Sequence, residues 1–171
     1  TVVVHRIDGL YALDPAAGAA GHYRKLLASS REEPIFAWTE AHAIGAQGSG
    51  GPGGEWAATA RRLYRLRPGQ KPAEFPAPPG AAVSNLLETR DGRLHAFSQD
   101  GLFVWERERW RRIYHSERIT REAIRTILED RTGAIWLGLN GAVVRVAEQQ
   151  GTVLDLTRWI RKDDTVQSLL E

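Results

Sequence analysis

The stretch IRTILEDRTGAIW at residues 124–136 decides the fold, because the chain contains it more than once. A similar stretch, VSNLLETRDGRLH, lies at residues 83–95, and the hexapeptide VQSLLE at residues 166–171 repeats its beginning. The three starts are 41 and then 42 residues apart. A fixed period of about 40 residues is the signature of a repeat protein, in which each unit packs against its neighbours.

Turn residues between short apolar runs predict that each unit is built from β-strands. Residues 130–133 suit a hairpin turn, because the aspartate can bond the local backbone and the glycine can take a left-handed conformation. The dipeptides Asp100-Gly101 and Asn140-Gly141 suit two-residue type I′ hairpins. The best-defined unit is therefore predicted to hold four short antiparallel strands, at residues 124–129, 134–139, 142–147 and 152–156.

Four short antiparallel strands at this period describe one blade of a β-propeller, so we expect an all-β chain with about four blades' worth of sequence. Two more units are traced less sharply, through the runs at residues 35–40, 55–59 and 63–66 and through residues 1–13. Helix is the alternative for residues 120–129 and 153–171, where Leu154, Trp159 and Ile160 fit a helical stripe. The repeat favours strands, because the three hexapeptides should share one conformation.

The predicted boundaries follow from this alignment. We expect a partial blade at residues 1–30, blades at 31–78, 79–118 and 119–162, and the first strand of a next or closing blade at 163–171. Residues 165–171 can supply the strand that residues 1–27 lack, which would close a four-bladed ring. The interpretation we favour is that the chain is a fragment of a larger propeller.

Composition is ordinary for a globular domain and points away from several functions. Hydrophobic residues make up 42% and charged residues 26%, and the formal net charge is only +2. No apolar run approaches the length of a membrane span, and without cysteine the chain has no disulfide or thiol chemistry. The densest group of arginines, at residues 107–112, is interleaved with Glu106 and Glu108, which favours a solvated hairpin over a nucleic-acid groove.

The sequence ILEDRTGAIWLG at residues 127–138 resembles the two-component-regulator propeller repeat, and LETRDGRL at residues 87–94 resembles it less closely. GLFVW at residues 101–105 and GLYAL at residues 9–13 match the second half of that repeat. The chain departs from the pattern at three positions: His95 replaces its tryptophan, Arg62 replaces a glycine, and Ala142 replaces a leucine.

This resemblance implies an extracytoplasmic, periplasmic sensor region that precedes a membrane span and a histidine kinase or diguanylate cyclase. We therefore expect a non-catalytic ligand-sensing or interaction propeller of a bacterial two-component or cyclic-di-nucleotide signalling protein. Its partner would be an unidentified small-molecule or protein ligand and not a nucleic acid. This part of the protein would not itself contact the membrane, although the full protein would be membrane-anchored, and a homodimer is compatible with the resemblance.

A search for catalytic groups gives no candidate. The five histidines are dispersed without the close pairs that metal sites use, so we expect no metal and no cofactor. His95 is most simply a packing residue of a second strand. Two other classes stay open: a quinone-dependent dehydrogenase-like or scaffold propeller, suggested by GLYALDPAAG at residues 9–18, and a hydrolase or lyase propeller without an assignable acid–base set.

Candidate ligand contacts are expected where the connections between blades meet the turns between second and third strands. Loops at such a face commonly carry binding residues. Trp159 lies in one connection, unlike Trp38, Trp56 and Trp136, which fall at strand positions that favour core packing. The predicted ligand-binding set is Tyr114, His115, Arg118, Arg125, Trp159, Arg161, Asp100 and Asn140.

Substitution of Trp159 and Arg161 by alanine should weaken ligand or partner binding and leave the melting temperature nearly unchanged, because neither side chain is expected in the core. Binding and thermal unfolding measurements on the same preparations check this. A large loss of stability in the Trp159→Ala variant alone would assign Trp159 to the core instead.

Overall fold

The computed structural model describes most of the chain and contains four antiparallel sheets. The described residues are 2–6, 8–14, 22–31, 34–39, 55–59, 61–67, 70–80, 82–115, 117, 124–147, 150–155, 164–166 and 169. Among them, no helix is long and apolar enough to cross a membrane.

Each sheet is a simple meander in which sequential strands pair. The first sheet contains β1 (Val2–Arg6), β2 (Gly9–Asp14) and β3 (His22–Ala28). The second contains β4 (Ile35–Thr39), β5 (Glu55–Thr59), β6 (Arg62–Leu66) and β7 (Ala73–Pro76). The third contains β8 (Asn85–Glu88), β9 (Leu94–Ser98), β10 (Gly101–Glu106) and β11 (Arg109–Tyr114). The fourth contains β12 (Thr126–Glu129), β13 (Ile135–Gly138), β14 (Ala142–Ala147) and β15 (Gln150–Asp155).

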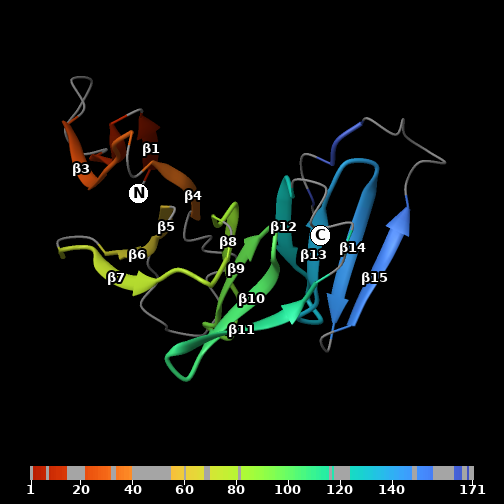
Figure 1. Cartoon of the computed structure of the whole chain (residues 1–171). Coiled ribbons are helices and arrows are strands. Elements are labelled where there is room, and N and C mark those ends of the chain that lie inside the picture. The colour runs from red at the N-terminus through yellow and green to blue at the C-terminus, as the bar shows by residue number, and fades with distance from the viewer. Residues whose placement is uncertain are drawn as a thin grey trace.

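The sheets follow one another in an arc, as Figure 1 shows. The first strands of the last three sheets, β4, β8 and β12, contact one another in succession. A radial arrangement of four-stranded meanders with their first strands together is the blade arrangement of a β-propeller. The all-β prediction is therefore confirmed, and helix is wrong for residues 126–129 and 153–155. The exact division into blades at residues 30, 78, 118 and 162 stays a prediction.

The core is divided among the interfaces between neighbouring sheets. Leu10, Ile35 and Tyr64 belong to the cluster between the first and second sheets. Trp56 and Leu94 belong to the cluster between the second and third. The cluster between the third and fourth sheets is the largest in side-chain bulk, and its buried members are Phe97, Leu102, Ile124, Ile135, Leu137, Leu139, Val144 and Val146.

The turn predictions are confirmed in one place and wrong in two. Asp130 bonds the local backbone as expected, and Gly133 adopts a φ of 81°. The predicted type I′ turns at Asp100-Gly101 and Asn140-Gly141 do not form, because only the glycine of each pair has a positive φ. Arg107 and Glu108 instead have φ values of 50° and 60°, which are those of a type I′ turn.

The turn at Arg107 and Glu108 joins β10 to β11 and belongs to the charged hairpin expected from the sequence. The pairing of Glu106 with Arg109 closes the hairpin, and Arg111 forms an ion pair with Glu106. The tight two-residue connection imposes the positive φ angles, although neither residue is a glycine or asparagine.

The described part of the C-terminal segment lies beside the fourth sheet. Thr165 forms an isolated antiparallel bridge with Asn140, and the Val166 amide donates to the Leu139 carbonyl over 3.1 Å. Thr165 thus pairs with the turn of the fourth sheet and not with an N-terminal strand, and β1 and β15 lie at opposite ends of the arc (Figure 1). The remaining residues of 163–171, apart from Asp164 and Leu169, and the glycine-rich residues 45–54 lie outside the described part.

Two glycines should respond differently to alanine. Gly133→Ala should cost about 1 kcal/mol of unfolding free energy, since its φ is positive but no atom lies within 4 Å of the added Cβ. Gly101→Ala should cost about 3 kcal/mol or more, because its φ is 130° and its Cβ would meet the Tyr114 carbonyl oxygen. Urea unfolding followed by tryptophan fluorescence measures both. Equal losses would contradict the close approach of β11 to Gly101.

Candidate ligand-binding cleft

In the last three sheets, the second residue of the second strand occupies an equivalent place, and it differs in the third sheet. Trp56 of β5 lies opposite Arg65, whose guanidinium lies 5.3 Å from the indole centroid. Trp136 of β13 lies opposite Arg145 at 5.7 Å in the same way. In β9 this position holds His95, opposite Val104. The third sheet therefore lacks the stacked tryptophan and arginine of its neighbours.

Both indole N–H groups have carboxylate acceptors. Trp136 Nε1 donates to Asp130 Oδ2 over 2.7 Å within its own sheet. Trp56 Nε1 donates to Glu88 Oε2 over 2.8 Å, which crosses from the second sheet to the third. The buried Trp56 and the half-buried Trp136 thus each fill space and satisfy their polar atom.

His95 has neither of these acceptors. Its side chain is 4% exposed, and Nδ1 has no hydrogen-bond partner among the described residues. Thr89 occupies the position of Asp130, and the carboxylate has moved two residues along to Asp91. There Asp91 accepts from the Thr89 hydroxyl over 2.7 Å and from Arg93 Nε over 2.6 Å, so it is already engaged.

The carboxylate of the next sheet is also engaged. Glu129 is the repeat equivalent of Glu88, but it accepts the Arg90 amide over 2.8 Å. Arg90 also donates from its guanidinium to the Asp130 carbonyl, over 3.1 Å. These bonds tie the turn of the third sheet to the turn of the fourth and leave His95 between them.

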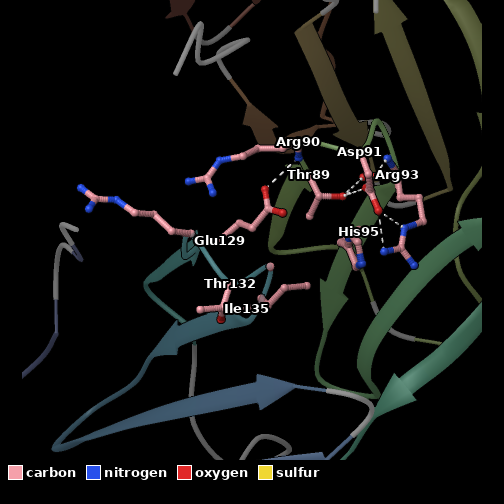
Figure 2. Close-up of a pocket in the computed structure, with 10 residues that line it drawn as sticks. Thr89, Arg90, Asp91, Arg93, His95, Glu129, Thr132 and Ile135 are labelled. Atoms are coloured by element: carbon pink, nitrogen blue, oxygen red, sulfur yellow. Dashed lines mark hydrogen bonds and ion pairs between the residues drawn. The ribbon is translucent and has the colours of Figure 1, made fainter. Parts of the chain in front are cut away.

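A cleft of about 340 Å³ opens where the imidazole takes the place of an indole. Figure 2 shows His95 between the turn that carries Asp91 and Arg93 and the elements that carry Glu129, Thr132 and Ile135. The cleft therefore lies between the third and fourth sheets, at the turns that join first to second strands. Its lining residues are Thr89, Arg90, Asp91, Arg93, His95, Glu129, Arg131, Thr132, Gly133 and Ile135.

The charges around the cleft are set by these contacts. Burial lowers the pKa of His95 to about 4, and the nearby Arg93 guanidinium adds to the shift, so the imidazole is neutral at pH 7. Burial acts to raise the pKa of Asp91, but hydrogen bonds from Arg93 and Thr89 outweigh it and hold that pKa at about 2. Hydrogen bonds from the Thr132 and Trp136 side chains hold the pKa of Asp130 well below its usual range.

This arrangement is suited to holding a ligand. Asp91 and Glu129 accept bonds from Arg93 and Arg90, guanidinium groups line the walls, and the neutral His95 has a ring nitrogen without a partner among the described residues. No group of three or more histidine, aspartate or glutamate side chains in the described part of the chain could hold a metal ion.

Five of the residues predicted as ligand contacts lie in the described part, at the opposite ends of the strands. The exposed His115 approaches the Asp100 carbonyl with Nδ1 at 3.2 Å. Tyr114 packs against the core between the third and fourth sheets. Asn140 accepts from the Thr165 hydroxyl over 3.2 Å, and the Arg125 amide donates to the Gly138 carbonyl over 2.9 Å.

The remaining members of the set, Arg118, Trp159 and Arg161, lie outside the described residues, so the set as a whole stays a prediction. The structure brings Asp100 and His115 together, and Asn140 and Arg125 belong to the adjacent sheet. Sequence reasoning missed the cleft at His95. The signal was present, because residues 89–95 align with residues 130–136 and show both the loss of tryptophan and the exchanged positions of threonine and aspartate.

Comparison of structures identifies similar folds. A streptogramin B lyase superposes with a TM-score of 0.64 at 12% identity, over 88% of this chain and 48% of the lyase chain. The extracellular domain of a putative hybrid two-component system from B. thetaiotaomicron superposes with a TM-score of 0.60 at 17% identity, over 85% of this chain and 20% of that one. The chain has the fold of a β-propeller.

Two further similar structures are again one lyase and one extracellular domain of a two-component system. A catalytically inactive virginiamycin B lyase from Staphylococcus aureus, solved with quinupristin, gives a TM-score of 0.60 at 12% identity over 88% of this chain and 54% of that one. The extracellular domain of a second putative hybrid two-component system from B. thetaiotaomicron gives a TM-score of 0.56 at 15% identity, over 90% of this chain and 27% of that one. The chain thus spans about half the length of the two lyases. It spans about a quarter or less of the length of the two-component-system domains. Comparison of sequences finds no matching family model and no matching curated protein.

The lowered pKa of His95 predicts a specific pH dependence. The unfolded chain binds a proton at His95 below about pH 6.5, whereas the folded chain does so only near pH 4, so the free energy of unfolding should fall as the pH decreases from 7 to 5. His95→Gln should flatten this decrease, because the glutamine does not titrate. Identical pH profiles for the wild-type protein and His95→Gln would show that His95 is not buried in its neutral form.

Proposed function

We propose that this chain is the ligand-sensing or interaction propeller of a bacterial two-component or cyclic-di-nucleotide signalling protein. The observation that carries the proposal is the cleft at His95, where a ring nitrogen is buried without a partner in the described part of the chain while the adjacent carboxylates are occupied by protein donors. Such a site can bind a ligand by hydrogen bonds and charge.

The fold neighbours support this proposal. Extracellular domains of putative hybrid two-component systems are among them, which is consistent with an extracytoplasmic, periplasmic location. This chain spans only 20% to 27% of the length of those chains. We therefore include in the proposal, and do not take from the structures, that the full protein has a membrane anchor and a kinase or cyclase domain. Ligand binding would change the arrangement of the two subunits of a dimer, and this change would alter the activity of the output domain.

The lyase neighbours make catalysis the alternative that has to be tested. A lyase would need a base that is free to take a proton from its substrate. In the cleft, Asp91 and Glu129 accept bonds from Arg93 and Arg90, and His95 is buried with a lowered pKa. This pattern favours binding over proton transfer.

The test is a direct assay for turnover. The purified chain, incubated with quinupristin and with common ester, glycoside and alcohol substrates at pH 7, should leave each of them unchanged. Liquid chromatography of the incubation mixtures measures this, with the unsubstituted, catalytically active form of the Staphylococcus aureus virginiamycin B lyase as the positive control. Consumption of any substrate at a rate that His95→Gln abolishes would contradict the non-catalytic role.

A further inference from the structure

We propose that the cleft between the third and fourth sheets binds a small organic carboxylate, with His95 at its buried end and arginine side chains at its walls. The inference rests on the proposed binding function and specifies its ligand chemistry. It concerns a different place from the connection face that carries Asp100, His115 and Asn140.

The size of the cleft limits the ligand to a small molecule. Ligand pockets usually measure about 300–1,000 Å³, so a cleft of about 340 Å³ lies at the lower end of that range. Ile135, which is 4% exposed, gives it one apolar wall. A short chain or a single ring fits this space, with its apolar part against Ile135.

The charge of the lining favours an anion. Three guanidinium groups, those of Arg90, Arg93 and Arg131, line the cleft together with two carboxylates, and His95 is uncharged. Both carboxylates, Asp91 and Glu129, already accept hydrogen bonds from the protein. A ligand carboxylate would balance the excess positive charge, and arginine is the side chain whose planar donor groups match a carboxylate best.

His95 supplies the hydrogen bond that distinguishes this cleft from a bare cluster of arginines. Nδ1 is buried without a partner among the described residues, which is unfavourable, and it is closed off from the open cleft. A ligand atom that bonds to Nδ1 after a small shift of the ring or of the neighbouring turn gains an interaction that the free protein lacks. The imidazole can donate or accept there according to its tautomer. A second carboxylate oxygen or a hydroxyl group of the ligand would serve as the partner.

The neighbouring interface shows how the cleft can be closed. Between the second and third sheets, Trp56 fills the equivalent space and its indole donates to Glu88 over 2.8 Å. The repeat equivalents at the next interface are His95 and Glu129. His95→Trp should therefore place an indole within reach of Glu129 and fill the cleft with the side chain that the repeat has elsewhere.

The experiment is an NMR titration of the chain at pH 7 with succinate and with benzoate, observed at the His95 ring protons and the backbone amides of residues 89–93 and 130–133. We expect saturable shifts with at least one of the two probes. His95→Trp should abolish the amide shifts and raise the melting temperature by about 2–4 °C, as expected from a stabilising substitution in a chain of this length.

Two arginine variants make the test independent of that substitution. Arg131→Gln, on an exposed turn, should weaken binding at least fivefold, and Arg109→Gln, on the exposed edge strand β11, should leave it unchanged. Shifts that persist in both His95→Trp and Arg131→Gln, or the absence of saturable shifts with either probe, would overturn the carboxylate proposal. If neither probe gives saturable shifts, an increase in melting temperature with an uncharged ligand would still support the proposed binding function. Chemical conversion of a bound probe would contradict the binding function itself.

Discussion

Every sheet inside the arc has to be covered on both faces, and the rest of the structure depends on this constraint. All five residues of β9 are buried, because Leu94 and Ala96 pack toward the second sheet while Phe97 packs toward the fourth. Alternate residues of a strand point to opposite faces, so one short strand contributes to two separate cores. An apolar side chain that is lost from such a strand leaves a gap between blades that the rest of its own sheet cannot fill.

His95 is the place where this constraint is relaxed. Trp56 and Trp136 each fill an equivalent position, stack against an arginine of the next strand and donate to a carboxylate. At His95 the arginine is replaced by Val104 and the nearby carboxylates are bound by other groups. The protein thereby forgoes packing and leaves a buried polar atom unsatisfied, a cost that is common at binding sites. The proposed function rests on this feature: the third sheet loses stabilising contacts at His95 and has a cleft there instead.

Much of the fold could be predicted from the sequence, because its turns contain residues with a clear mechanism. Asp130 and Gly133 mark their hairpin through side-chain bonding and a positive φ. The type I′ turn at Arg107 and Glu108 could not be predicted in this way, since pairing of the flanking strands imposes it on residues with no preference for it. The cleft was also missed, since it depends on where carboxylates in adjacent sheets find their partners, and that is fixed only when the sheets pack.

A crystal structure of the unliganded protein would test the central claim most directly, through the surroundings of His95. The account predicts an open cleft between the third and fourth sheets, with Glu129 bonded to the Arg90 amide and no protein atom within hydrogen-bond distance of His95 Nδ1. A structure in which the Glu129 carboxylate bonds to His95 and the two turns close over it would contradict the account, because the histidine would then be an ordinary member of the core.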